Sequence, residues 1–217
     1  MSDHIHQNQP VLTYGADLND AELVVILLHG RGSTAEATLP LAQELFTDQS
    51  FYLIPQAAHN RWYPNSAFGP LASNEPDLTS ALRRIDELVQ EMHDAGFSDD
   101  QIAFGGFSQG ACLASEYVAR NARKYAGLFV FSGALIGPPG TERDYPGSFD
   151  GMPVFIGGSD IDPWVAHDLM AESAAVFERM GAQVDFRTYP GMAHTVNQDE
   201  LEAIQEMLAV ASGAETK

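Results

Sequence analysis

Short apolar runs recur along the chain in the pattern expected of strands that are covered on both faces. The clearest is Leu23–Leu28, which contains no polar residue. Further strands are predicted at Phe51–Ile54, Gln101–Phe104, Ala126–Phe131, Pro153–Ile156 and Val184–Tyr189. Val11–Gly15 is predicted as a first edge strand. The pattern therefore predicts about seven strands.

Between these runs, apolar residues recur at intervals of three and four, which is the period of an amphipathic helix. The strongest example extends from Asp77 to about Ala95. Further helices are predicted after a cap at Ser33 or Thr34, over Ala111–Ala122, through Leu169 to Met180, and over Asp199–Val210. Alternating strands and helices indicate an α/β fold with a mostly parallel central sheet and helices on both faces.

The length of 217 residues fits one domain over 1–217 and leaves little room for a separate lid domain. Residues 1–10 and 212–217 are expected to be flexible ends. No apolar run approaches the roughly 18–20 residues that span a bilayer. Met1–Pro10 also lacks the basic and apolar pattern of a secretory signal, so we expect a cytoplasmic protein without membrane insertion.

The charge is strongly acidic, with 30 Asp and Glu against 11 Lys and Arg and a formal net charge of −19. Such a field argues against a nucleic-acid partner and an anionic membrane surface. Only two lysines occur, Lys124 and Lys217. This composition favours a halophilic source, with an ordinary acidic protein as the alternative. The single cysteine, Cys112, excludes an internal disulfide and is interpreted as a small buried residue.

The segment from Gly105 to Gly110 carries the first candidate for chemistry. Ser108 stands between Gly106 and Gly110 in the pattern G-x-S-x-G, where a predicted strand turns sharply into a predicted helix. Residues without a β-carbon relieve the crowding of such a turn. Because the pattern also arises by chance, it does not by itself establish a nucleophile.

A serine nucleophile needs a base and an acid that orients the base. In this architecture the expected chain order is serine, acid, histidine. The sequence offers Ser108, then Asp160 or Asp162, then His194, each after a predicted strand. Spacing leaves the acid open between the two aspartates. His59 is a rival base by location but breaks the expected order.

The remaining histidines have other interpretations. His4 and His6 stand in the N-terminal tail, where a weak metal site would need further ligands. His93 and His167 are expected to be solvated at helix ends, and His29 is expected to support the following glycine turn. No set of histidines and acids has zinc spacing, so neither metal nor cofactor is predicted.

Acyl transfer also requires two backbone N–H groups for the developing oxyanion. We expect one from Gln109, directly after the nucleophile, and one from Arg31 in the turn after the second strand. A phosphate-binding interpretation of His29–Gly32 fails because the lysine and Ser/Thr of a P-loop are absent.

Aromatic side chains on loops after strands are candidate walls of a substrate pocket. They are Trp62, Tyr63, Phe68 and Trp164. The alternative for Trp62 is that it pins its long loop to the body of the protein. The Arg31 side chain is expected to face an anionic part of the substrate.

Five segments together resemble the phospholipase/carboxylesterase family of α/β-hydrolases, which includes acyl-protein thioesterases and bacterial esterases. They are Leu28–Gly32, Trp62-Tyr63, Gly105–Gly110, Asp162–Val165 and Tyr189–His194. The resemblance extends from about Leu23 to the last helix. It implies an α/β-hydrolase fold with Ser108 as nucleophile and His194 as base. It also selects Asp162 as the acid, because the family's aspartate precedes a proline.

Three positions depart from the thioesterase members of that family. Pro64 stands where they carry an aspartate, Arg31 where they tend to have leucine, and Gly157 where an early histidine is usual. These changes concern the substrate pocket and leave the three catalytic positions intact.

Together, the residues and the resemblance predict a serine hydrolase that cleaves a carboxylic ester or thioester of small to medium size. A lactone or ring-cleavage-product hydrolase is the alternative among hydrolases. A non-catalytic binding module is the alternative from another class. The expected partner is a small-molecule ester, and the sequence is compatible with a homodimer.

Overall fold

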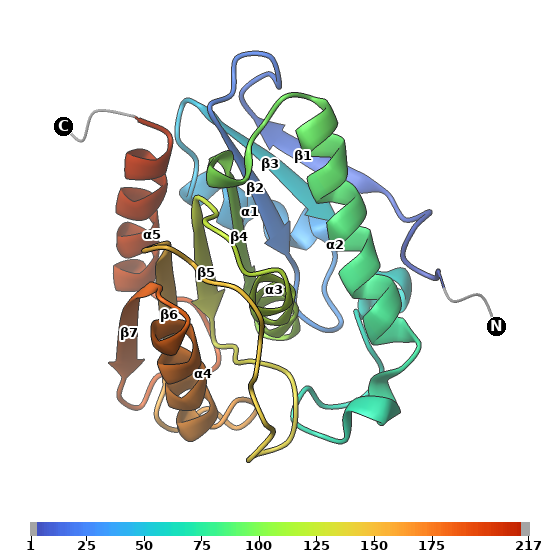
Figure 1. Cartoon of the computed structure of the whole chain (residues 1–217), viewed down its shortest axis with the longest axis vertical. Helices are drawn as coiled ribbons and strands as arrows, with labels where there is room; N and C mark the ends of the chain where they lie inside the picture. The colour runs from blue at the N-terminus through green and yellow to red at the C-terminus, as the bar shows by residue number, and fades with distance from the viewer. Residues whose placement is uncertain (1–3, 214–217) are drawn as a thin grey trace.

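The computed structural model describes residues 4–213 and has a seven-stranded sheet at its centre (Figure 1). The strands are β1 (Val11–Gly15), β2 (Leu23–Leu28), β3 (Ser50–Pro55), β4 (Ile102–Phe107), β5 (Gly127–Phe131), β6 (Pro153–Ser159) and β7 (Gln183–Tyr189). Their order across the sheet is β1-β3-β2-β4-β5-β6-β7. Only β1 runs antiparallel to its neighbour β3, and every other pair is parallel. The predicted mostly parallel sheet is confirmed.

Among residues 4–213, five α-helices cover the sheet: α1 (Ala35–Glu44), α2 (Asp77–Asp94), α3 (Gln109–Arg120), α4 (His167–Arg179) and α5 (Gln198–Ala211). Helices α2, α3 and α4 bury their apolar sides in one cluster with Val24, Ile26 and Leu28 of β2. Helices α1 and α5 do so on the opposite face with Leu23, Val25 and Leu27. Since successive residues of β2 point to opposite faces, its unbroken apolar run follows from this double cover.

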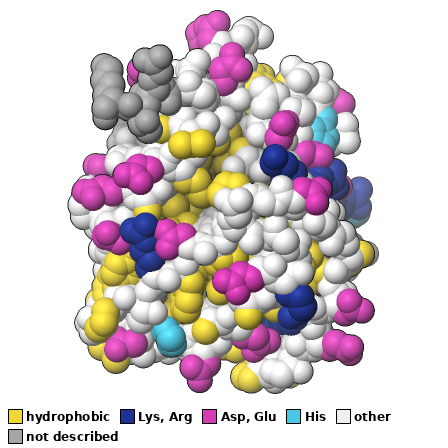
Figure 2. Space-filling view, turned by 60° about the vertical axis from the view of Figure 1, so that its left-hand side comes forward, with side chains coloured by type: hydrophobic (Ala, Val, Ile, Leu, Met, Phe, Trp, Pro, Cys, Tyr) yellow, Lys and Arg dark blue, Asp and Glu magenta, His cyan; other side chains and the backbone are white. Residues whose placement is uncertain are grey.

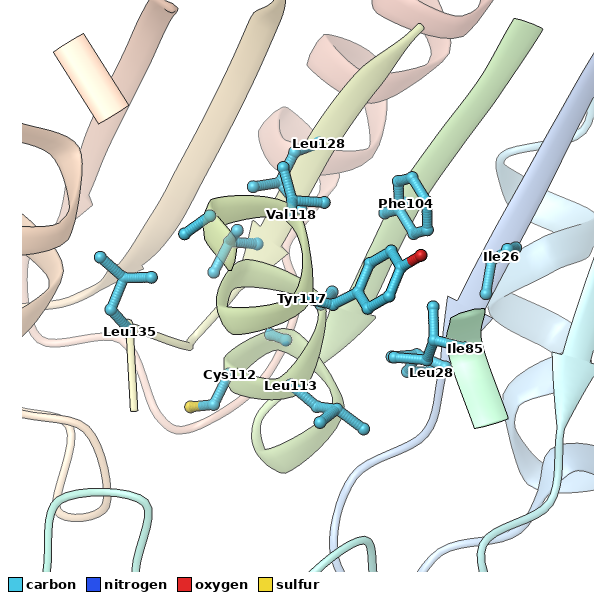
Figure 3. Close-up of a cluster of buried hydrophobic side chains, with 14 of the residues drawn as sticks. Ile26, Leu28, Ile85, Phe104, Cys112, Leu113, Tyr117, Val118, Leu128 and Leu135 are labelled. Atoms are coloured by element: carbon cyan, nitrogen blue, oxygen red, sulfur yellow. The ribbon is translucent and has the colours of Figure 1, made fainter. Parts of the chain in front are cut away.

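Helix α3 packs on β4, β5 and β2 in the middle of the sheet (Figure 3). The Tyr117 ring of α3 packs on Phe104 of β4 with 5.4 Å between ring centroids. Its hydroxyl donates to Asp86 Oδ1 of α2 at 3.1 Å. The helix is therefore fixed to both the sheet and the neighbouring helix.

Element boundaries around Ser108 differ from the sequence prediction. Strand β4 continues to Phe107 and helix α3 begins at Gln109, so the connection between them is Ser108 alone. The predicted strand ended at Phe104 because glycines weaken a strand pattern. In the fold, Gly105 is required by packing, since a Cβ there would lie 1.9 Å from the Phe129 ring.

The N-terminal segment, predicted as a flexible end, packs on the body where the structure describes it. His6 is fully buried. Its Nδ1 accepts from the Ala58 N–H at 3.0 Å, and its Nε2–H donates to the Trp62 carbonyl at 3.0 Å. The tail interpretation of His6 is therefore wrong. At the other end Ser212 is buried, and residues 1–3 and 214–217 lie outside the described part of the chain.

Acidic side chains are spread over the face shown in Figure 2 and do not gather into one patch. Within residues 4–213, no helix has the length and apolar character needed to cross a membrane.

Candidate active site

Ser108 occupies a strained turn between β4 and α3, with φ 56° and ψ −118°. The turn is held by backbone hydrogen bonds from Ser108 N to the Phe131 carbonyl at 2.9 Å and from Cys112 N to the Ser108 carbonyl at 3.0 Å. A non-glycine residue with positive φ costs energy and persists where its surroundings enforce it, which is typical of functional turns.

The glycines beside Ser108 are dictated by contact with β2. A Cβ on Gly110 would lie 2.2 Å from the Leu28 carbonyl oxygen. A Cβ on Gly106 would lie 2.7 Å from the same oxygen and equally close to the Gly110 carbonyl carbon. Because no real Cβ approaches backbone so closely, the G-x-S-x-G pattern follows from the packing of the turn against β2.

Asp162 and His194 form a direct pair. His194 Nδ1 lies 2.6 Å from Asp162 Oδ2, and the aspartate side chain has no exposed surface. Asp162 Oδ1 accepts from the backbone N–H groups of Trp164 at 2.8 Å and Val165 at 3.1 Å. Both carboxylate oxygens therefore have donors, as a buried carboxylate requires.

Asp160 has a different environment. It is exposed, and its Oδ1 accepts from the Gly191 N–H at 2.7 Å. This bond ties the loop after β6 to the loop after β7 that carries His194. Asp160 thus supports the backbone of that loop while Asp162 contacts the imidazole.

Ser108 and His194 line the same cavity, which has a volume of about 830 Å³. Residues of α1 close one side, Tyr63 to Phe68 another, and Trp164 to Val165 a third. The Phe107 ring lies 4.7 Å from the His194 ring and forms part of the lining. Two of the three predicted catalytic residues therefore line one cavity, and the third, Asp162, contacts the ring of His194.

The two predicted oxyanion donors border the cavity beside Ser108. Gln109 is the first residue of α3, so its N–H lies at a helix N-terminus. A Cβ on Gly30 would lie 3.6 Å from Ser108 Cβ, which brings the turn carrying Arg31 against the serine. Both residues are therefore close to Ser108.

His29 supports this turn as expected from its position before the glycine. Its Nδ1–H donates to the Gly30 carbonyl at 2.8 Å, and its Nε2 accepts from the Ala57 N–H at 3.0 Å. Burial lowers the pKa of His29, which keeps the ring neutral in this arrangement.

The aromatic candidates separate into two groups. Tyr63, Phe68 and Trp164 line the cavity, and Trp164 is 72% exposed at its rim. Trp62 is fully buried and outside the lining, so its assignment as a pocket wall is wrong. Its Nε1–H donates to the His29 carbonyl at 2.9 Å, which fits the alternative that it pins its loop.

The Arg31 side chain contacts the backbone of Pro64 and Asn65 beside the cavity. Its guanidinium donates to the Pro64 carbonyl at 2.7 Å and to the Asn65 carbonyl. These bonds engage two of its nitrogens with the protein itself. Arg31 also lines the cavity.

The other histidines weighed from the sequence, and Cys112, lie outside the Ser108–Asp162–His194 arrangement. His93 contacts Asp99 at 3.0 Å, and His167 contacts Thr188 at 2.8 Å. The rival base His59 is exposed and outside the cavity lining. Cys112 is buried, and burial raises its thiol pKa to about 11. Within residues 4–213, no group of three or more potential ligands is arranged to hold a metal ion.

Two side chains that hold loops beside the site were not predicted from the sequence. The Gln109 side chain bonds the backbone of Trp62 and Tyr63, although the motif draws attention only to its N–H. Glu200 is fully buried, and its Oε2 accepts from the Asn197 N–H at 2.9 Å. The segment Asn197-Gln198-Asp199-Glu200 matches the spacing of a capping box, a signal that could have indicated this bond.

Comparison with known proteins places the chain among hydrolases. The model of the family described as Phospholipase/Carboxylesterase matches residues 16–212. A solved phospholipase/carboxylesterase from Dyadobacter fermentans is 39% identical, with a TM-score of 0.89 over 95% of this chain and 100% of that chain. Acyl-protein thioesterase 1 of Kluyveromyces lactis is 28% identical, over 88% of this chain and 92% of its own. The Bacillus cereus carboxylesterase, at 22% identity, shares the fold, with a TM-score of 0.73 over 94% of this chain and 95% of that chain.

Proposed function

The chain belongs to the phospholipase/carboxylesterase family and is a carboxylesterase-family hydrolase. We propose that it cleaves carboxylic esters through an acyl-enzyme on Ser108. In this proposal His194 is the general base, Asp162 orients it, and the N–H groups of Arg31 and Gln109 stabilise the oxyanion. The substrate class is small to medium acyl or aryl esters.

One observation carries the proposal: the 2.6 Å contact between His194 Nδ1 and Asp162 Oδ2, on the wall of the cavity that also contains Ser108. A carboxylate at Nδ1 holds the proton there and leaves the Nε2 lone pair available. That lone pair can accept a proton from a serine hydroxyl, which is otherwise a poor nucleophile.

The reaction then proceeds in two halves. Ser108 Oγ attacks the carbonyl carbon while its proton passes to His194 Nε2, and the carbonyl oxygen becomes an oxyanion between the two N–H groups. Collapse of this intermediate expels the alcohol, which takes the proton from His194. Water then attacks the acyl-enzyme with His194 again as base, releasing the acid and restoring Ser108.

The shape of the cavity supports the choice of substrate size. A volume of about 830 Å³ is within the range of sites for small molecules. Tyr63, Phe68 and Trp164 offer apolar surface for an acyl or aryl group. Within this proposal, we expect esters with short acyl or aryl groups to react faster than palmitoyl esters.

A thioester substrate is the second candidate, because the Kluyveromyces lactis relative bears the name acyl-protein thioesterase. The same nucleophile and base serve both bond types, since a thiolate is a better leaving group than an alkoxide. A lactone would also react by the same steps, with the leaving alcohol remaining attached to the product.

Labelling with a fluorophosphonate probe tests the proposal. The probe should modify Ser108 in the wild type and leave Ser108→Ala unlabelled, and absence of labelling would indicate a non-catalytic binding module. A series of p-nitrophenyl esters of rising chain length, assayed beside an acyl-CoA and a lactone, should then give the highest kcat/KM with a short or aryl ester. Faster hydrolysis of palmitoyl esters would contradict the proposed substrate class.

A further inference from the structure

The two residues proposed as oxyanion donors share an unexpected feature: their side chains hold the same short segment, Trp62–Asn65. We propose that this segment positions the oxyanion hole, with the side chains of Gln109 and Arg31 as its positioning groups. The inference rests on the proposed function, because it assigns those N–H groups to the oxyanion.

The Gln109 side chain makes two hydrogen bonds to the segment. Its Oε1 accepts from the Trp62 N–H at 2.9 Å, and its Nε2 donates to the Tyr63 carbonyl at 2.8 Å. The residue is only 6% exposed, so these bonds are shielded from water. They fix the first residue of α3, and therefore the orientation of its own N–H, relative to the segment.

The Arg31 side chain holds the next two residues of the segment. Its guanidinium donates to the Pro64 carbonyl at 2.7 Å and to the Asn65 carbonyl, and it lies 5.9 Å from the centre of the Tyr63 ring. Arg31 is otherwise an exposed residue in a turn after β2. The side chain thus fastens this turn to the same four residues that Gln109 holds.

Further bonds make the segment a firm support. Trp62 Nε1–H donates to the His29 carbonyl at 2.9 Å, directly before the oxyanion turn. Two further contacts hold the segment and do not involve the oxyanion turn. The Trp62 carbonyl accepts from the buried His6 ring at 3.0 Å, and the Asn65 N–H donates to Asn74 Oδ1 at 2.8 Å. The segment is therefore anchored independently of Arg31 and Gln109.

This arrangement matters because an oxyanion hole acts by fixed geometry. Its donors must already point at the position where charge develops, and displacements near 1 Å can reduce the rate about 100-fold. Here the two donors belong to different elements, the turn after β2 and the start of α3. A common support sets the spacing between them, which neither element sets alone.

Gln109→Met and Arg31→Met test the inference, since each removes the side-chain bonds and retains the backbone N–H. We expect kcat for a good p-nitrophenyl ester to fall about 10- to 100-fold, with KM changed less than about twofold. The inhibition constant of a trifluoromethyl ketone, which forms a tetrahedral oxyanion adduct with the serine, should rise by a similar factor. Arg31→Lys, which retains one or two donors, should recover part of the loss.

Gln101→Met and Arg179→Met are the matched controls. Each also removes a side-chain bond to a backbone carbonyl, from Gln101 Nε2 to Glu22 at 3.3 Å and from Arg179 to Arg143 at 2.7 Å, but neither bond reaches the segment Trp62–Asn65. Both variants should leave kcat and the ketone affinity unchanged. An equal loss of kcat in either control would show that the loss of any such side-chain bond suffices and would overturn the inference.

The two methionine variants also test each other. If both act through one support, the combined variant should lose less activity than the product of the single losses. If Arg31→Met kept the wild-type kcat and ketone affinity, the inference would be overturned, even if Gln109→Met failed to fold. Arg31 is exposed, so its substitution is not expected to prevent folding. Failure of the proposed function itself would be distinct, since the wild type would then neither label at Ser108 nor hydrolyse esters.

Discussion

The turn that carries Ser108 and the loop that carries His194 contribute to one cavity but are held in opposite ways. The turn is a single residue between a buried strand and a buried helix, and its neighbours Gly106 and Gly110 touch the backbone of β2. The His194 loop, residues 190–197, has no buried residue, and a Cβ on Gly191 would meet nothing within 4 Å. Backbone packing fixes the first region, and side chains fix the second.

Three carboxylates from outside residues 190–197 hold the His194 loop. Asp160 accepts from the Gly191 N–H, Asp162 contacts the His194 ring, and Glu200 accepts from the Asn197 N–H. Individual bonds of this kind can be removed one at a time. We therefore expect substitutions in the His194 loop to have graded effects, while those beside Ser108 should disrupt the whole turn.

The largest effect is expected from substitutions that remove the reacting groups themselves. This effect does not depend on how the two regions are held. Ser108→Ala and His194→Ala should each lower kcat by about 10⁴-fold or more, since nucleophile and base act as one unit. Both should keep a cooperative thermal transition near that of the wild type. Steady-state hydrolysis of a p-nitrophenyl ester and calorimetry measure the two quantities. Residual activity within tenfold of the wild type in either variant would contradict the proposed roles.

The two aspartates provide the next test, because they hold the His194 loop at different points. Asp162→Asn should reduce kcat about 10⁴-fold, since an amide can present its N–H₂ to the ring and favour the wrong tautomer. Asp160→Asn retains an oxygen for the Gly191 N–H and should stay within about threefold of the wild type. The pH–rate profile of each variant checks the assignment. A severe loss in Asp160→Asn with a mild one in Asp162→Asn would reverse it.

Two glycine substitutions compare the regions directly. Gly110→Ala places a Cβ 2.2 Å from the Leu28 carbonyl oxygen and should destabilise the fold by about 4 kcal/mol. Gly191→Ala meets no atoms within 4 Å and bears only the strain of φ +71°, about 1–2 kcal/mol. Urea unfolding measures both. Equal destabilisation would show that the two regions are held alike.

This contrast also explains what the sequence could predict. The Ser108 turn was predictable because its requirements are local: an apolar run, glycines two residues either side, and a following helix. The extent of β4 was not, since Gly105 is compatible with a strand only because the Phe129 ring from the neighbouring strand fills its place. Such a contact depends on a partner distant in the sequence.

Ser108, Asp162 and His194 could be selected as catalytic candidates from their order in the chain and from the family resemblance. The residues that hold the neighbouring loops in place could not be predicted. Trp62 and Tyr63 are adjacent aromatics on one loop, yet only Tyr63 lines the cavity. The difference follows from the His29 carbonyl and the His6 ring, which engage Trp62 from distant parts of the chain. Composition gives no information about such pairings.

Glu200 provides the last test of the contrast between the regions, because its carboxyl group accepts a bond from the His194 loop and its pKa is raised. It is fully buried, and no hydrogen-bond partner for its Oε1 is found among residues 4–213. A Cβ on Gly157 would lie 2.3 Å from that oxygen. Burial raises the pKa of Glu200 from 4.5 to about 7, with a bond from the Asn197 N–H opposing the shift and the charge of Asp199 adding to it.

A raised carboxyl pKa makes the fold less stable as the pH rises. Below pH 4.5 the carboxyl is protonated in both states, but between 4.5 and about 7 the unfolded chain loses the proton first, so stability should fall by up to about 3 kcal/mol. Glu200→Gln removes this titration and keeps an oxygen for the Asn197 N–H. Its melting temperature should therefore decline less than that of the wild type between pH 5 and pH 8. Glu202→Gln, an exposed carboxyl on the same helix, should retain the wild-type decline. Parallel curves for the wild type and Glu200→Gln would contradict a raised pKa of Glu200 in the folded protein.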